Sequence, residues 1–408
     1  MKQIFKKWTE ISLILRILVG LAIGALIGIA VPQAGGIAVL GSVFVGALKG
    51  VAPVLVFLLV LSSLANANGG IGSRFKTVII LYLLGTLLAS VVAVLASFIM
   101  PVNMDLVVGA GETAAPSGIG EVLMNLIRNM VTNPVSALVD ANYIGILFWA
   151  VLGGMALNSI KSDKTSAVIA DLAEMVSITV RWIIQMAPFG VCGLVYSAVS
   201  ESGLGIFTTY GKLLVVLLSS MAIVQLIFYP LIVGVFLKRN PYPLVFRCIK
   251  ESGITAFFTR SSAANIPVNM TLCENLGLDR DFYSVSIPLG ATINMGGAAV
   301  TITVMAMACA HTLGIHVDIP TAIFLSVLSA LGACGASGVA GGSLMLIPMA
   351  CSLFGIGNDI AMQAVAVGFI IGVIQDSVET AINSNTDVLF TATAEFYENL
   401  KHGKKVEF

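Results

Sequence analysis

Apolar residues occur along this chain in long blocks that short polar segments separate. A helix crosses the ~30 Å hydrocarbon core of a bilayer with about 20 residues. Blocks that reach or exceed this length lie at 11–31, 37–65, 76–100, 119–157, 166–199, 210–237, 244–277, 282–313, 319–356 and 358–399. The pattern predicts an all-α membrane protein in which several helices span the bilayer.

The composition favours the same class. Hydrophobic residues make up 58% of the 408 residues and charged residues only 10%, whereas soluble domains carry about 25% charged residues. Lys plus Arg and Asp plus Glu both number 21, so the net charge favours neither nucleic acid nor an acidic partner. The 6 cysteines lie in apolar stretches without metal-ligand spacing, and we interpret them as small hydrophobic residues.

The distribution of basic residues predicts the orientation in the membrane. Lys and Arg occur before the first block, in the loop at Arg280 and after the last block, whereas the loops at 101–121, 311–320 and 354–360 contain acids and no Lys or Arg. The positive-inside rule places both termini in the cytoplasm and these three loops outside. The first apolar run starts at Ile11, exceeds the ~7–15 residues of a signal peptide and precedes no cleavage site, so we expect a retained helix.

Two blocks return to the side of the membrane on which they start. Both ends of residues 244–277 are cytoplasmic in this orientation, and both ends of residues 319–356 are outside. Small residues interrupt each block midway, in "TRSSAANIP" and "GACGASGVAGGS". We therefore expect two re-entrant helical hairpins whose tips meet, each followed by a long helix, which makes two inverted repeats. Alternatively, the small residues serve only close helix packing, which is how we interpret Gly20, Gly24 and Gly28.

The last block carries acids without a basic neighbour. Asp376, Thr380, Asn383 and Asp387 are spaced by four, three and four residues and share one helix face, with Glu379 beside it. An acid at the membrane centre costs roughly 2.5–3.5 kcal/mol. Pairing with Arg260 is one solution, but one base cannot neutralise three acids. The other solution is that cations bind here, an ammonium group at Asp376 and a metal ion at Asp387.

The preceding long block contains a second polar interruption, "IPLGATINMGGAAV". Each glycine weakens a helix by about 1 kcal/mol relative to alanine. Gly290, Asn294, Gly296 and Gly297 therefore predict a break in mid-membrane that turns main-chain carbonyls toward an ion.

These motifs resemble the dicarboxylate/amino acid:cation symporter family, which includes glutamate transporters. "RSSAANIPVNM" is similar to the serine-rich tip of the family's first hairpin, "NMGG" to its NMDGT motif, and "DSVETAINSNTD" to its final-helix pattern D-x-x-R-T-x-x-N-x-x-x-D. The topology matches along the whole chain, and residues 245–395 match motif by motif. The resemblance implies a glutamate-transporter-like fold of eight transmembrane helices and two re-entrant hairpins.

The resemblance further implies a division of the chain into two domains. A scaffold domain, 11–65 and 119–199, would assemble a homotrimer. A mobile transport domain, 76–100, 210–237 and 244–399, would move against it in the cytoplasmic (inner) membrane of a bacterium, in contact with lipid. The implied activity is sodium-coupled uptake by alternating access.

The resemblance also implies a role for individual residues. Asp376 would bind the substrate amino group, and the complete substrate site would comprise Ser261, Ser262, Val339, Ser343, Asp376, Glu379, Thr380 and Asn383. One sodium site would use the carbonyls of Gly290, Asn294 and Asn383 and the carboxylate of Asp387. A second sodium site would lie around Thr292, Met295, Ala333, Cys334 and Ala336.

Two departures from the family pattern refine the expected function. Glu379 stands where carriers of acidic amino acids have an arginine, so a substrate side-chain carboxylate would be repelled. We therefore expect a small neutral amino acid with a hydroxyl group, L-serine or L-threonine, which Glu379 and Thr380 would contact; Glu379 could instead bond to Arg260. Gly296 replaces the aspartate of NMDGT, and "LYLLGT" has Gly85, which predicts fewer coupled sodium ions than in glutamate carriers.

Other functions are less compatible with the sequence. A sodium symporter of acidic amino acids or dicarboxylates is the main alternative, and an ion channel is a distant one, because the two tips differ in sequence whereas selectivity filters use repeated rings. We do not expect an enzyme, since a hydrolase built on Ser261 or Ser262 lacks a nearby histidine base. Arg16, Lys49 and Arg128 lie within apolar blocks, where snorkelling or scaffold pairing would account for them.

Overall fold

The computed structural model describes residue 11, residues 13–65, 73–106, 124, 127–203, 205–336 and 341–404. The regular structure in these residues is helical throughout. The first half contains α2 (Leu13–Ala30), α3 (Ala38–Ala65), α4 (Ser73–Ile99), α6 (Pro134–Val139), α7 (Tyr143–Ile160), α8 (Asp163–Gln185) and α9 (Ala187–Ser202). The second half contains α10 (Gly205–Ile223), α11 (Tyr229–Leu237), α12 (Tyr242–Cys248), α13 (Ile254–Thr259), α14 (Ser262–Asn275), α15 (Arg280–Ile293), α16 (Gly296–Thr312), α17 (Ile319–Ala333), α18 (Ile347–Ser352) and α19 (Asn358–Lys401).

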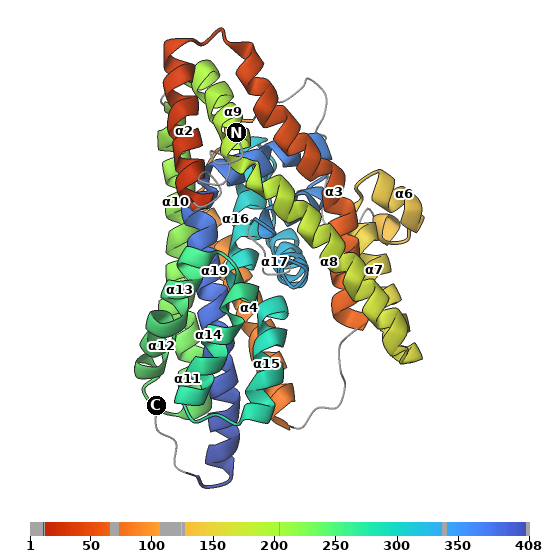
Figure 1. Cartoon of the computed structure of the whole chain (residues 1–408), viewed down its shortest axis with the longest axis vertical. Coiled ribbons are helices and arrows are strands. Elements are labelled where there is room, and N and C mark those ends of the chain that lie inside the picture. Colours follow the sequence, from red (N-terminus) through yellow and green to blue (C-terminus); the bar gives the residue numbers. More distant parts are fainter. Residues whose placement is uncertain are drawn as a thin grey trace.

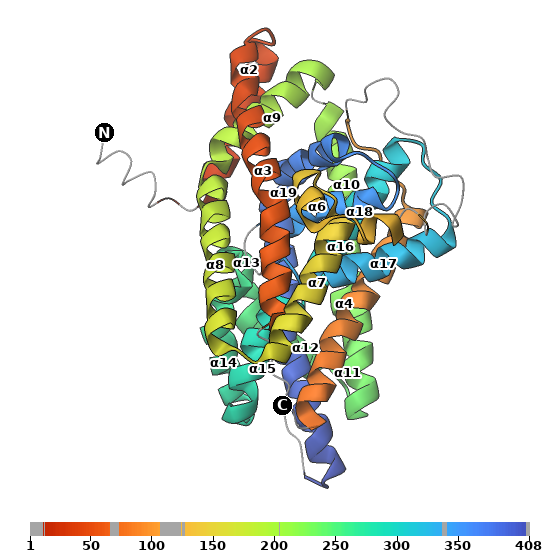
Figure 2. The same cartoon turned by 90° about the vertical axis from the view of Figure 1, so that its right-hand side faces the viewer.

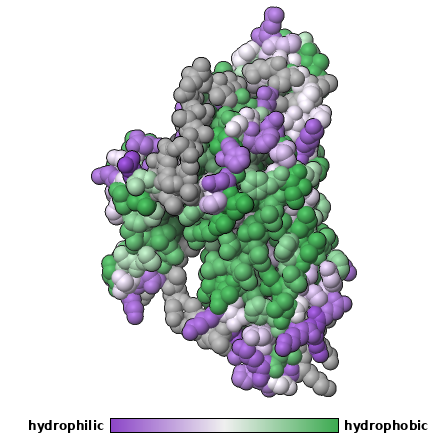
Figure 3. All heavy atoms as spheres, turned by 180° about the vertical axis from the view of Figure 1, so that it is seen from behind, coloured by the Kyte–Doolittle hydropathy of each residue, from purple (hydrophilic) through white to green (hydrophobic). Residues whose placement is uncertain are grey.

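The prediction of a multi-helix membrane protein is confirmed at this level. Within the described ranges, five helical stretches are long and apolar enough to cross a bilayer, namely Gly35–Ser62, Arg74–Ile99, Phe207–Leu237, Arg280–Thr312 and Asn358–Lys401. Figure 3 shows a wide band of hydrophobic residues across the middle of one face, with hydrophilic residues at both ends. The count of eight spanning helices and the re-entry of the hairpins stay predictions.

Helices α2, α3, α7, α8 and α9 pack mainly against one another and are seen together in Figures 1 and 2. Glycines bring α2 and α9 into backbone contact: a Cβ at Gly20 would lie 2.1 Å from the Pro188 carbonyl oxygen, and one at Gly24 would lie 2.3 Å from that of Cys192. These glycines therefore serve close packing, as predicted. Arg16 on α2 donates to the Gln185 side chain on α8 at 3.0 Å, which accounts for this arginine by pairing between helices.

Most of the remaining helices pack around α19, the longest helix of the described chain. Helices α4, α10, α13, α14, α15 and α16 all pack on it, and Figure 1 shows it running through the middle of the bundle. The end of α11, the start of α15 and the end of α19 lie together at the lower end of Figure 1. The predicted break is present in the middle of the apolar stretch Arg280–Thr312, because α15 ends at Ile293 and α16 begins at Gly296.

The chain reverses between α13 and α14. Here α12, a π-helical turn (Ile249–Gly253) and α13 form one arm, α14 forms the other, and the two arms pack against each other. Arg260 occupies the reversal in the left-handed conformation, φ 52°, and the Ser261 side chain accepts a hydrogen bond from the Ala264 amide and so caps α14. The second interrupted block forms α17, a short 3-10 turn (Ser343–Leu346) and α18.

Candidate functional site

The polar face of α19 lies inside the bundle. Asp376, Glu379 and Asp387 are only 2%, 5% and 0% exposed, although they stand on a helix apolar enough to span a membrane. A charge this deeply buried requires a partner. The partners differ for each of the three carboxylates.

Asp376 is paired with a base from the first hairpin. Arg260 Nε donates to Asp376 Oδ2 at 2.7 Å, and Nη2 forms an ion pair with the same oxygen at 2.7 Å. The Gly341 amide donates to Asp376 Oδ1 at 3.3 Å. Asp376 thus joins the tip of the first hairpin to the second interrupted block. The pairing that the sequence left open is present at Asp376, whereas no bond joins Arg260 to Glu379 among the described residues.

Glu379 is held by neutral donors. Its Oε2 accepts hydrogen bonds from Thr301 Oγ1 at 2.7 Å, from Ser343 Oγ at 2.8 Å and from Gln375 Nε2 at 2.5 Å. In the part of the chain that the structure describes, no Lys or Arg forms an ion pair with Glu379. The side chain therefore accepts hydrogen bonds from α16, from the second interrupted block and from its own helix.

The other predicted substrate residues are placed as follows. Thr380 donates to the Asp376 carbonyl oxygen of its own helix at 2.7 Å, and Asn383 Oδ1 accepts from the Gly297 amide at 2.7 Å. Ser262 Oγ is buried without a hydrogen-bond partner among the described residues. Ser261 caps α14, and Val339 lies outside the described residues.

The residues predicted for the first sodium site converge at the break between α15 and α16. Asn294 Nδ2 donates to Asp387 Oδ1 at 2.9 Å and to the Asn383 carbonyl oxygen at 3.2 Å. A Cβ at Gly290 would lie 2.7 Å from Asp387 Oδ1, so this glycine lets the carboxylate approach the backbone. Asp387 Oδ2 and Asn294 Oδ1 are buried without hydrogen-bond partners among the described residues.

The residues predicted for the second sodium site lie where α17 ends beside α15. The Cys334 thiol is 3.4 Å from the Ile293 carbonyl oxygen at the helix break, and Thr292 Oγ1 donates to the Leu289 carbonyl oxygen at 2.7 Å. Met295, Ala333 and Ala336 are buried. The structure thus brings the start of the second tip to the broken helix.

Gly296, the position that departs from the family motif, faces Tyr229 on α11. A Cβ at Gly296 would lie only 1.9 Å from Tyr229 Oη, and this hydroxyl is buried without a hydrogen-bond partner among the described residues. A Cβ at Gly85 would likewise lie 2.7 Å from the Phe390 ring. Two aromatic side chains therefore fill the space next to these two glycines.

Several polar residues of this region were missed by the sequence reasoning. Thr301 and Gln375 bond to Glu379. Tyr82 belongs to the "LYLLGT" segment that the sequence analysis had already considered, and its hydroxyl donates to carbonyl oxygens of α15 and α19 and contacts Thr391. Asn265 and Asn269 bond to Ser384 and tie the first hairpin to α19. A stripe of amides and hydroxyls in apolar helices was the available signal.

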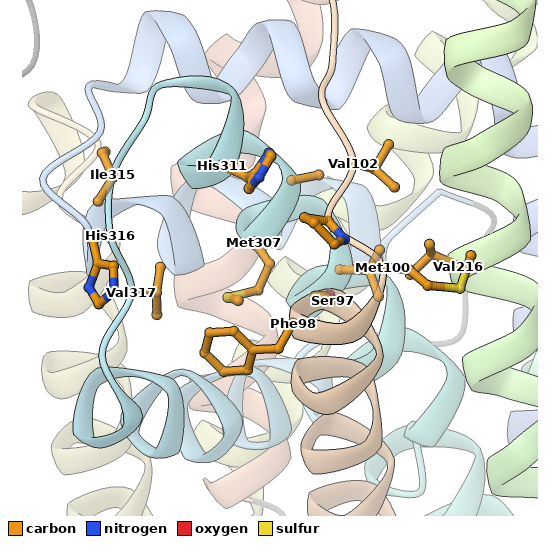
Figure 4. Close-up of a pocket in the computed structure, with 13 residues that line it drawn as sticks. Ser97, Phe98, Met100, Val102, Val216, Met307, His311, Ile315, His316 and Val317 are labelled. Atoms are coloured by element: carbon orange, nitrogen blue, oxygen red, sulfur yellow. The ribbon is translucent and has the colours of Figure 1, made fainter.

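Little open space remains around Asp376. The cavity that Arg260, Gly341 and Asp376 line measures about 10 Å³, no more than the space of one water molecule. A larger cavity of about 250 Å³ lies elsewhere, between the ends of α4 and α16, α10 and the segment before α17 (Figure 4). It shares no residue with the polar face of α19 and contains His311 at its border.

Comparison with known proteins is consistent with this geometry. Residues 13–395 match the model of the sodium:dicarboxylate symporter family. A protein of Bifidobacterium adolescentis named serine/threonine transporter SstT is 59% identical over 97% of this chain and 92% of its own length. Proteins of the same name from Streptococcus thermophilus and Streptococcus agalactiae are 55% and 54% identical over 97% of this chain and 98% of theirs. The chain therefore belongs to the sodium:dicarboxylate symporter family.

Proposed function

We propose that this protein is a sodium-coupled symporter that takes up L-serine and L-threonine by alternating access. The observation that carries the proposal is the face of α19, where three carboxylates are buried and, among the described residues, only Asp376 pairs with an arginine. Buried acids of this kind mark ion and substrate pathways in membrane proteins. Relatives named serine/threonine transporter, more than half identical over nearly the full chain, support the choice of substrate.

Sodium is the co-transported ion in this proposal. Asp387 Oδ2 and Asn294 Oδ1 are buried acceptors without donors in the described residues, and leaving such oxygens unpaired is costly. Hard cations prefer carboxylate, amide and carbonyl oxygens. We assign the first sodium ion to Asp387, Asn294, Asn383 and Gly290, and a second to the region of Thr292, Met295, Ala333, Cys334 and Ala336.

The amino acid would bind near Asp376, with Ser261, Ser262, Ser343, Glu379, Thr380, Asn383 and the predicted Val339 around it. A neutral zwitterion supplies an ammonium group for Asp376 and a carboxylate for main-chain donors at the two tips. A second carboxylate on the substrate would approach Glu379, which has no base beside it in the described chain, and would be repelled. Glu379 and its hydroxyl neighbours Thr301 and Ser343 favour a substrate hydroxyl.

The proposed cycle follows from the family. Residues 76–100, 210–237 and 244–399 would move as a transport domain against the scaffold at 11–65 and 119–199, through which three copies would assemble in the bacterial inner membrane with both termini cytoplasmic. Tyr229 fills the space beside Gly296, which supports fewer coupled sodium ions than in glutamate carriers. Simultaneous measurement of serine and sodium flux tests this number, and three sodium ions per serine would contradict it.

The function is tested by uptake of labelled L-serine into proteoliposomes with an inward sodium gradient and with potassium in place of sodium. We expect uptake only with sodium, competed by threonine and not by aspartate. Sodium-driven aspartate uptake would overturn the substrate assignment but keep the mechanism. Absence of sodium-dependent uptake of both amino acids would refute the proposal.

A further inference from the structure

Arg260 is paired with Asp376, the carboxylate to which the ammonium group of the proposed substrate would bind. Two of its nitrogens lie 2.7 Å from Asp376 Oδ2, while Asp376 Oδ1 already accepts from the Gly341 amide. Both carboxylate oxygens are therefore engaged. The cavity beside this pair measures only about 10 Å³, so a substrate ammonium group has no room at Asp376 unless the guanidinium moves away.

The position of Arg260 is compatible with replacement of its guanidinium at Asp376 by another cation. It stands at the hairpin reversal with φ 52°, a backbone region that a non-glycine residue seldom adopts. Its Nη1 is buried without a hydrogen-bond partner among the described residues, so the guanidinium has a donor left over. The cavity beside it has about 10 Å³, so the pair fills the space near Asp376.

We propose that Arg260 stands in for the ammonium group of the substrate whenever the carrier is empty; this rests on the proposed function. When an amino acid enters, its ammonium group replaces the guanidinium at Asp376, and the guanidinium turns to the carboxylate of the same molecule. One ion pair becomes two, and the net charge of the site stays zero. A zwitterion satisfies both groups, whereas an amine or a carboxylate alone satisfies only one.

The exchange has a consequence for the transport cycle. An empty carrier must return across the membrane, and an unpaired Asp376 carboxylate would oppose that return because a buried charge without its partner is strongly unfavourable. Arg260 neutralises the Asp376 carboxylate while the empty carrier returns. During exchange of external for internal serine the carrier moves only when loaded, so the substrate ammonium group pairs with Asp376 in both directions. Arg260 then only helps the main-chain donors to bind the substrate carboxylate, and saturating serine on both sides offsets that loss of affinity.

The test compares net uptake with exchange in proteoliposomes that carry Arg260→Gln. Net uptake is measured as sodium-driven entry of labelled L-serine into serine-free vesicles. Exchange is measured with saturating serine and sodium on both sides, labelled outside and unlabelled inside. We expect net uptake to fall by about a hundredfold, the effect of an uncompensated buried carboxylate, while exchange stays within about threefold. Arg260→Lys should restore part of the net uptake because it returns the charge.

Arg247→Gln provides the matched control, since Arg247 lies in the same hairpin but is partly exposed and pairs with Glu251. Both rates should be unchanged in this variant. Equal loss of net uptake and exchange in Arg260→Gln, or no loss of either, would overturn the role of Arg260. Absence of serine transport in the unmodified protein would instead refute the proposed function, so the two failures are distinguishable.

Discussion

Gly290→Ala provides a direct test of the proposed sodium site. A Cβ at this position would lie 2.7 Å from Asp387 Oδ1 and 2.8 Å from Tyr82 Oη, closer than real Cβ contacts. Tyr82 is held by bonds to Ser286, Asp387 and Thr391, so the Asp387 carboxylate is the group that has to move. Overpacking of this kind costs about 1–3 kcal/mol. If this energy falls on the sodium-bound state, sodium affinity decreases about 5-fold to 150-fold.

The measurement is the sodium concentration that gives half-maximal serine uptake in proteoliposomes. Gly211→Ala is the control, because a Cβ at Gly211 meets nothing within 4 Å while the change in helix propensity, about 1 kcal/mol, is the same. The control should keep the sodium dependence of the unmodified protein. A Gly290→Ala carrier with active uptake and an unchanged half-saturating sodium concentration would show that Asp387 does not bind the ion.

Three further predictions concern neighbouring parts of the structure. Gly296→Ala should lower the free energy of unfolding by about 1–3 kcal/mol because its Cβ meets Tyr229 Oη. Adding Tyr229→Phe to the same chain should restore most of this stability, as measured by thermal unfolding in detergent. An equal loss of stability with tyrosine or with phenylalanine at position 229 would contradict the contact. Glu379→Gln should raise the KM for serine by about 10-fold to 100-fold, since charge-assisted hydrogen bonds contribute about 1.5–3 kcal/mol, without changing sodium half-saturation; an unchanged KM would exclude Glu379 from the substrate site. Arg74 donates a hydrogen bond to Asp279 at 2.8 Å and lowers the pKa of that partly exposed carboxyl, so the pair stabilises the protein above the ordinary carboxyl pKa and this stabilisation is lost as the pH falls through the lowered pKa. Arg74→Gln should therefore lower the free energy of unfolding by at most about 1 kcal/mol at pH 7. A loss of stability that persists in strong acid would argue against the ion pair.

Features set by local sequence were predictable. Helix positions followed from the length of the apolar blocks, and the break at Asn294 followed from the glycines around it. The shared face of Asp376, Asn383 and Asp387 followed from helical geometry alone. In each case the physical cause lies within a few residues of the feature, so no tertiary information was needed.

Features set by packing between distant segments were not predictable from the residues. Arg260 and Asp376 are 116 positions apart, and the sequence offered Glu379 as an equally acceptable partner. Tyr229 fills the space beside Gly296 although no motif connects α11 with α16. The resemblance to the family implied the roles of residues. It could not show which helix fills the space that the aspartate side chain of the family motif leaves free at Gly296.

The three carboxylates of α19 are not equivalent, and their differences constrain how the two proposed ligands are coupled. Asp376 has a charged partner that another cation can replace, Glu379 has only neutral donors, and Asp387 retains an oxygen without a donor in the described chain. Asp376 and Asp387 are separated by about 16 Å along the helix, too far for an ammonium group and a sodium ion to touch. Coupling must therefore pass through the protein, and Asn383 lies between the two on the same face. Its carbonyl oxygen accepts from Asn294 beside Asp387, and its side chain accepts from the Gly297 amide beyond the helix break. An ion that orders this break therefore also orders the face on which the amino acid binds.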